Sequence, residues 1–150
     1  MDGDQVALEV QGMGRLQFHV RDSVQPARKW LPIALNSFAC PALPTCGLAL
    51  TESERALPAL LEELHETLDE LGLADVETHV RMTGCPNGCA RPYSTEMAFV
   101  GRGKNRYDIH LGGERVGVRM NEIFCENAPR DQLVPVLRPV FERYAAERND

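Results

Sequence analysis

Two cysteines separated by three residues lie in the stretch Thr83-Gly-Cys-Pro-Asn-Gly-Cys89. A second pair, separated by five residues, lies in the stretch Ala39-Cys-Pro-Ala-Leu-Pro-Thr-Cys46. Glycine and proline interrupt both stretches, so each pair is predicted to lie in a shaped loop rather than in a regular element. Such loops can wrap a metal centre and direct backbone N–H groups at its sulfur ligands. The candidate metal ligands are Cys40, Cys46, Cys85 and Cys89.

Three interpretations of these cysteines remain open from spacing alone. They can be unliganded buried thiols, because free cysteine is often buried, although two tight pairs in two Gly/Pro loops are hard to explain by packing. They can hold a structural zinc ion, for which the second pair has the usual spacing and the first has not. They can ligate an iron–sulfur cluster, which suits soft thiolates on loops of unequal length. We favour the cluster.

Composition and charge exclude several functional classes. The chain has 150 residues, enough for one domain with a sizeable core, and a formal net charge of −6. An acidic chain has no bulk attraction for phosphate backbones, so nucleic acid is not an expected partner. No apolar run approaches the roughly 20 residues that cross a membrane. The N-terminus lacks the basic and apolar regions of a secretory signal, which predicts a cytoplasmic, reducing location without disulfides. The fifth cysteine, Cys125, is interpreted as a packed thiol.

Hydrophobic periodicity predicts two helices. Thr51 and Glu54 match a capping box at the start of the first helix, and Pro58 suits its first turn. Leucines at spacings of three and four follow and form one apolar stripe. Gly72 is the predicted stop of this helix. A second helix is predicted over residues 131–147.

Alternating residues predict strands elsewhere in the chain. Two short strands are expected within residues 1–22, and others over residues 76–82 and 97–100. Residues 107–111 and 116–120 are predicted to form a hairpin around Gly112 and Gly113. The order of strands, helix, strands and helix predicts an α+β fold, with a mixed or antiparallel sheet and flanking helices.

The cysteine loops resemble those of the siroheme-dependent sulfite and nitrite reductases. That family has a Cys-x5-Cys pair followed by Thr-Gly-Cys-x3-Cys, and both motifs stand here in order. The flanks are similar as well: residues 48–55 resemble the segment after the first pair, and residues 103–113 resemble a later hairpin. The resemblance runs from about residue 35 to residue 147. The loop residues are more similar to assimilatory sulfite reductase hemoproteins than to nitrite reductases, which remain the alternative.

The resemblance implies a nitrite/sulfite reductase cluster-binding domain with two cofactors, a 4Fe–4S cluster and siroheme. The four cysteines would ligate the cluster, and Cys89 would also bridge to the siroheme iron. The implied reaction is the six-electron reduction of sulfite to sulfide. Asn87 would lie near the heme as a hydrogen-bond donor, although asparagine in this position is equally a common turn former. A non-enzymatic metal-binding or electron-transfer domain is the other alternative.

The resemblance also implies an organisation and partners. Residues 1–34 are expected to be a divergent N-terminal segment, a remnant of a ferredoxin-like half-domain, and residues 35–150 are expected to be the cluster- and siroheme-binding domain. The family's sulfite-binding Arg and Lys residues lie largely in an earlier half of a longer chain, so we expect a fragment or split subunit that lacks them. The implied partners are sulfite, an electron donor (ferredoxin or an NADPH-fed flavoprotein) and a chain that supplies the other half.

Overall fold

The computed structural model describes residues 5–10, 14–19, 32–114 and 116–148 of the chain. These residues fall into two compact units, which divide between residues 30 and 31. The first unit is an antiparallel pair, β1 (Gln5–Val10) and β2 (Gly14–His19), with Val10 opposite Gly14. The two strands predicted at the start of the chain are thus present.

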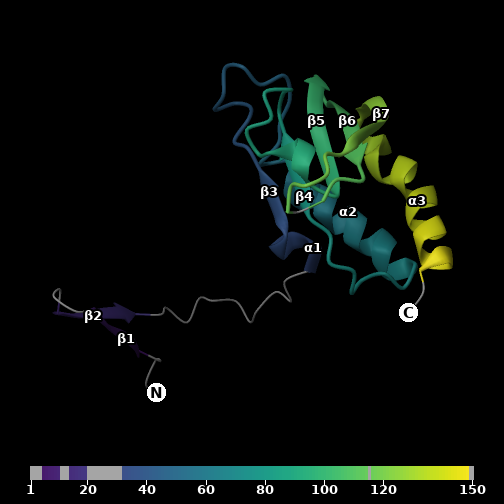
Figure 1. The fold of residues 1–150 in the computed structure, drawn as a ribbon. Coiled ribbons are helices and arrows are strands. Elements are labelled where there is room, and N and C mark those ends of the chain that lie inside the picture. The colour runs from purple at the N-terminus through teal and green to yellow at the C-terminus, as the bar shows by residue number, and fades with distance from the viewer. Residues whose placement is uncertain (1–4, 11–13, 20–31, 115, 149–150) are drawn as a thin grey trace. The chain divides into compact units, whose positions relative to one another are not determined.

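The second unit is built on a five-stranded mixed sheet in the order β3-β4-β5-β6-β7 (Figure 1). The strands β3 (Ser37–Ala39), β4 (Val80–Thr83) and β5 (Met97–Gly103) are parallel to one another. The strands β6 (Arg106–Leu111) and β7 (Glu122–Pro129) continue the sheet in antiparallel pairs. A single helical turn, α1 (Pro32–Leu35), precedes the sheet. The predicted α+β class with a mixed sheet is confirmed.

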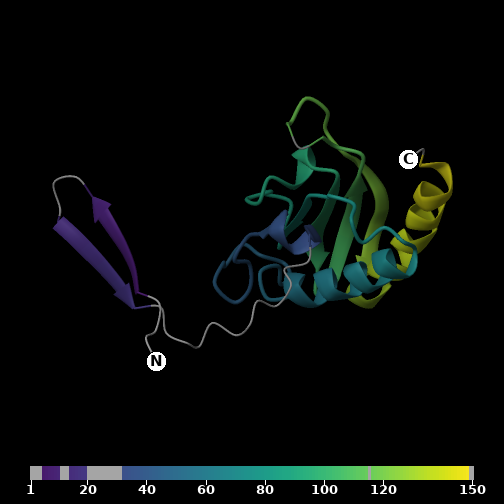
Figure 2. The same cartoon turned by 90° about the horizontal axis from the view of Figure 1, so that it is seen from below.

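Two helices cover one face of this sheet, as Figure 2 shows. They are α2 (Leu57–Glu70) and α3 (Leu133–Glu147), which follows a short 3-10 turn, η2 (Arg130–Gln132). The apolar stripe predicted for the first helix is buried, because its leucines pack on the side chains that one face of the sheet presents. The most deeply buried members of this core are Leu60, Leu64, Val80, Met82, Phe99, Ile109, Leu133 and Leu137.

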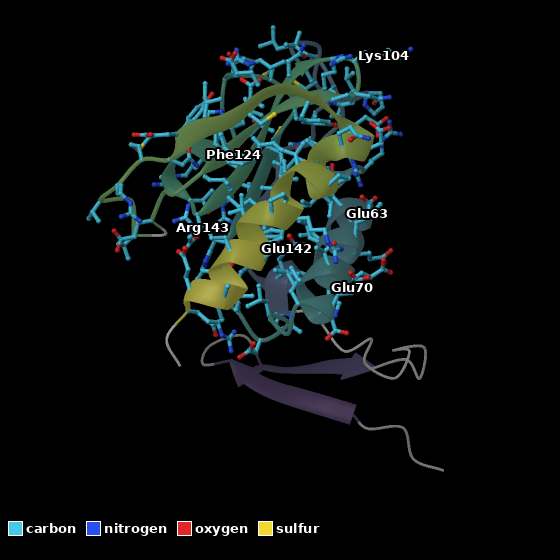
Figure 3. All side chains as sticks on the ribbon, turned by 90° about the vertical axis from the view of Figure 1, so that its right-hand side faces the viewer. Glu63, Glu70, Lys104, Phe124, Glu142 and Arg143 are labelled. Carbon is cyan, nitrogen blue, oxygen red and sulfur yellow. The ribbon has the colours of Figure 1, made fainter. Side chains whose placement is uncertain are left out.

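Ion pairs join the outer surfaces of the two helices. Figure 3 looks onto this side of the unit, where Glu63 and Glu70 of α2 lie beside α3. Nη1 and Nη2 of Arg130, in the turn η2 that leads into α3, donate to the Glu63 carboxylate at 3.1 and 2.9 Å, and Nη1 of Arg138 donates to Glu70 at 2.9 Å. Exposed pairs of this kind contribute about 1 kcal/mol or less each, so the buried leucines dominate the association of α2 with the sheet.

The predicted capping box is wrong. The helix α2 begins at Leu57 with Ala56 as its N-cap, without a side-chain cap. Thr51 is buried instead, where its hydroxyl donates to the Tyr107 hydroxyl at 3.1 Å and accepts the backbone N–H of Asn105 at 3.1 Å. The Thr51 hydroxyl therefore bonds to residues of the β5–β6 hairpin and not to the first turn of α2.

The predicted return strand of the hairpin is also misplaced. Val116, Val118 and Met120 are exposed and lie before β7, which begins at Glu122. Because β7 is an edge strand that is mostly exposed on both faces, its sequence lacks the alternation by which a half-buried strand is recognised. The alternation of residues 116–120 marked a loop instead.

Gly72 ends α2 as predicted, and it does so in a left-handed conformation with φ +71°. The Leu73 N–H donates to the Leu68 carbonyl at 2.7 Å and the Gly72 N–H to Asp69 at 3.0 Å, which is a Schellman arrangement. We expect Gly72→Ala to lower the free energy of unfolding by about 1 kcal/mol, because a Cβ is disfavoured at positive φ. Chemical denaturation would measure this, and Gly72→Asn should lose less. Equal losses for the two variants would contradict the conformational explanation.

The helices within the described ranges lack the combination of length and hydropathy that a membrane-spanning helix needs.

Candidate metal centre between two cysteine loops

The parallel pairing of β3 with β4 brings the two cysteine loops together. Cys40 directly follows β3, and Cys85 follows β4 after one glycine. Ala39 lies opposite Met82 in the sheet, and the Cys40 N–H continues the ladder by donating to the Met82 carbonyl at 3.1 Å. Loops that leave the carboxyl ends of neighbouring parallel strands emerge at the same edge of a sheet, where ligands commonly bind. Figure 1 shows the two connections side by side at this edge.

The first loop folds back on itself around Cys46. The Cys46 N–H donates to the Ala42 carbonyl at 2.7 Å, and the Ala49 N–H donates to the Cys46 carbonyl at 3.2 Å. Ala42 has φ +51° and is buried, with Cys40 and Ala90 as neighbours in a small apolar cluster. The loop is therefore a fixed structure packed against the second loop rather than a solvated connection.

Gly84 is the point at which the two loops meet. Its carbonyl accepts the N–H groups of Leu50 at 2.8 Å and Thr51 at 3.2 Å. A Cβ on Gly84 would lie 2.5 Å from the Ala42 Cβ and 2.7 Å from the Thr51 carbonyl oxygen, so only glycine fits. The Gly84 N–H donates to the Cys40 sulfur at 3.3 Å, a contact that stabilises a thiolate.

The four predicted ligands differ in exposure. Cys40 and Cys85 are buried, Cys46 is half-buried and Cys89 is exposed. Asn87 lies exposed in the turn between Cys85 and Cys89. In the described part of the chain, no three Cys, His, Asp or Glu side chains stand close enough together to hold a metal ion as they are oriented. Cys125, on β7, is half-buried and packs against the main core, in agreement with its interpretation as a packed thiol.

An open cavity of about 530 Å³ adjoins Cys89. Its wall includes the exposed side chains of Leu35, at the end of α1, and Phe38, on β3, and it carries Arg81 and Arg91 as cations. The Arg81 guanidinium lies 5.9 Å from the centre of the Phe38 ring and donates to the Asn36 carbonyl at 3.1 Å. Burial lowers the pKa of Arg81, but an arginine remains charged at neutral pH. The cavity can therefore receive a large, partly apolar ligand that carries negative charge.

Sequence reasoning did not find Leu35, Phe38 or Arg81 of the cavity wall, and it did not find the role of Gly84. Leu35, Phe38 and Arg81 come together only because β3 pairs with β4. The Thr-Gly-Cys motif contained Gly84, but a close approach between loops leaves no periodic signal in a sequence.

His110 lies behind the second loop, on β6, with 5% of its surface exposed. Burial lowers its pKa below the ordinary 6.5, although the charge of Asp108 opposes the change. Between the lowered pKa and 6.5 the unfolded chain binds the proton more tightly, so stability falls as pH decreases through this window. We expect the slope of unfolding free energy against pH to flatten in His110→Gln, by less than about 1.4 kcal/mol per pH unit, the limit for one proton. Urea titrations between pH 5 and pH 7 would measure it, and parallel slopes would contradict it.

The chain matches curated proteins over most of its length. A sulfite reductase [NADPH] hemoprotein beta-component from Staphylococcus saprophyticus is 50% identical over 115 residues, which are 77% of this chain and 20% of that protein. The protein of the same name from Myxococcus xanthus is 46% identical over 130 residues, 87% of this chain and 23% of that one. Over the matched residues, this chain is a homologue of the sulfite reductase hemoproteins. The resemblance seen in the cysteine loops is thereby confirmed.

The chain spans about a fifth of the length of these sulfite reductase relatives. The Mycobacterium tuberculosis NirA protein shares the fold, with a TM-score of 0.66 over 79% of this chain and 24% of that one, at 22% sequence identity. No protein-family model matches the chain.

Proposed function

We propose that this chain is the cluster- and siroheme-binding module of a sulfite reductase hemoprotein. The observation that carries the proposal is the packing of the two cysteine loops at one edge of the parallel strands, in a chain homologous to hemoproteins of that name. In this role, Cys40, Cys46, Cys85 and Cys89 would hold a 4Fe–4S cluster, and Cys89 would also hold siroheme. When bound, the two cofactors supply the chemistry for the six-electron reduction of sulfite to sulfide.

The donor set fits the cluster in three respects. Four thiols are soft ligands, and their loops are already packed together around Gly84. The Gly84 N–H, which donates to Cys40, would lower the energy of a thiolate there. Binding still requires the four side chains to turn toward a common point, because they do not converge as they stand.

The cavity beside Cys89 fits siroheme. Its exposed apolar side chains would cover the macrocycle, and Arg81 and Arg91 would neutralise carboxylates at its rim. Asn87, exposed in the turn before Cys89, would donate a hydrogen bond toward the same ligand. Since Cys89 is the exposed ligand of the four, it is the one able to reach a group outside the cluster.

The names of the relatives support a proposal for the electron donor. We propose an NADPH-fed flavoprotein in this role, since these names specify NADPH and a beta-component, which implies a further component. Ferredoxin is the alternative donor. The proposed substrate is sulfite, which the names of the relatives contain. This proposal keeps the organisation expected from the sequence, with residues 1–34 as an N-terminal segment and residues 35–150 as the module, and it takes the location to be cytoplasmic.

The test is a spectrum of the chain purified from cells that make siroheme, with assays of iron and acid-labile sulfide. Siroheme gives intense visible absorption, with a red band that neither zinc nor an isolated cluster shows. A colourless protein containing zinc would contradict the proposal. A brown protein that contains iron and sulfide but lacks the red band would favour the electron-transfer domain instead. Faster reduction of nitrite than of sulfite would favour a nitrite reductase.

Cys89→Ser is expected to change the heme spectrum as well as the cluster spectrum, because the proposal gives this thiolate to both cofactors. The expected result is a shifted or lost red band together with a loss of cluster absorption. The matched control is Cys125→Ser, which changes a half-buried thiol on β7 outside the loops. An unchanged heme band in Cys89→Ser would show that Cys89 is not a ligand shared by the cluster and siroheme.

A further inference from the structure

The side chain of Tyr93 contacts the loop between Cys85 and Cys89 at two points. Its hydroxyl donates to the Pro86 carbonyl at 2.8 Å. Its ring lies against Gly88, where an added Cβ would be 2.9 Å from the ring carbon Cε2, and Gly88 itself has φ +69°. Tyr93 therefore contacts the loop at both ends, once next to Cys85 and once next to Cys89.

Tyr93 is itself held in place from the sheet. It lies in a 3-10 turn, η1 (Pro92–Ser94), which Arg91 opens in a left-handed conformation with φ +54°. The Tyr93 carbonyl accepts the Asn121 N–H at 2.9 Å, and the Asn121 amide donates to the carbonyls of Pro92 at 2.6 Å and Thr95 at 3.0 Å. The His110 ring stands at 66° to the Tyr93 ring, with 5.5 Å between centres.

We propose that Tyr93 is a positioning residue that sets the separation and direction of the Cys85 and Cys89 thiols. It connects the loop to β6 and to the segment before β7, which the loop's own hydrogen bonds do not reach. Burial raises the pKa of Tyr93, although the charge of Arg102 opposes the change, so the phenol is a neutral hydrogen-bond donor at neutral pH. The inference rests on the proposed function only in taking these thiols as ligands, since the fixed loop geometry exists without a cofactor.

The test compares Tyr93→Phe, which removes the hydroxyl and keeps the ring, with Tyr144→Phe. Tyr144 is 49% exposed on α3 and gives a matched control for the chemical change. In reduced, metal-free protein, the rate of alkylation by iodoacetamide is measured for each cysteine by peptide mass spectrometry. Because Cys85 is buried, it reacts only when the loop opens, whereas the exposed Cys89 reacts directly.

We expect Tyr93→Phe to speed alkylation of Cys85 about five-fold, the change that a hydrogen bond of ordinary net strength predicts. Cys40, buried in the first loop, should react at the wild-type rate, and Tyr144→Phe should match wild type at every cysteine. An unchanged rate at Cys85 would overturn the inference. An equal increase at Cys40 and Cys85 would also overturn it, because general destabilisation would explain both.

A second measurement reports on the ligand role. In protein reconstituted with iron and sulfide, the reduction potential of the cluster should differ between Tyr93→Phe and wild type and agree between Tyr144→Phe and wild type. Equal potentials in all three proteins would overturn the positioning role at the centre. Failure of the wild-type chain to take up a cluster would instead contradict the proposed function, while the alkylation rates would still decide how Tyr93 acts on the loop.

Discussion

Replacing Cys85 with serine is expected to abolish assembly of the iron–sulfur cluster. Cys85 is buried at the junction of the two loops, directly after Gly84, so a replacement ligand would have to enter a packed part of the molecule. Serine is a hard ligand that keeps its proton at neutral pH, and it replaces the soft thiolate poorly. Iron and acid-labile sulfide per chain should fall by at least about tenfold, since even changes behind the ligands commonly cost that much.

The control for this loss is Cys125→Ser. Cys125 lies on β7, half-buried against the main core and outside both loops, so its replacement should leave iron and sulfide at wild-type levels. Both variants should retain wild-type circular dichroism, because serine nearly matches cysteine in size. Wild-type iron content in Cys85→Ser would remove Cys85 from the ligand set and would favour a different centre.

Gly84→Ala is expected to lower the free energy of unfolding by about 1–3 kcal/mol, the usual cost of overpacking a filled site. The new methyl group would lie 2.5 Å from the Ala42 Cβ and 2.7 Å from the Thr51 carbonyl oxygen. These neighbours belong to the first cysteine loop, so relief of the clash must move the two loops apart. The variant should therefore also take up less iron than wild type.

The matched control is Gly47→Ala, in the first cysteine loop itself. A Cβ on Gly47 would meet no atom within 4 Å, so the same chemical change should leave unfolding free energy and iron content near wild type. Denaturant titration of the metal-free proteins separates the effect on folding from the effect on binding. If Gly84→Ala were as stable as Gly47→Ala, the close contact between the loops would not be present in solution.

The sequence by itself determined the local elements and the candidate ligands. The leucine spacing of α2, its end at Gly72 and the paired cysteines are short-range patterns, which depend on residues within a few positions of one another. The resemblance in the loops pointed to the sulfite reductase relatives for the same reason, because the motif residues lie close together in the sequence.

Only the tertiary structure decided how these parts meet. Residues 37–39 pair with residues 80–82, more than 40 positions away, and this parallel pairing places Cys40 beside the Cys85 loop and assembles the cavity beside Cys89. Because of the same long-range packing, the Thr51 hydroxyl forms hydrogen bonds with Tyr107 and Asn105 instead of capping the helix as predicted. The same packing also places β7 at the exposed edge of the sheet. A strand in that position does not need alternating apolar residues, so the sequence pattern did not locate it. Pairing between distant strands is governed by which buried faces fit together in space, and a linear pattern does not contain that information.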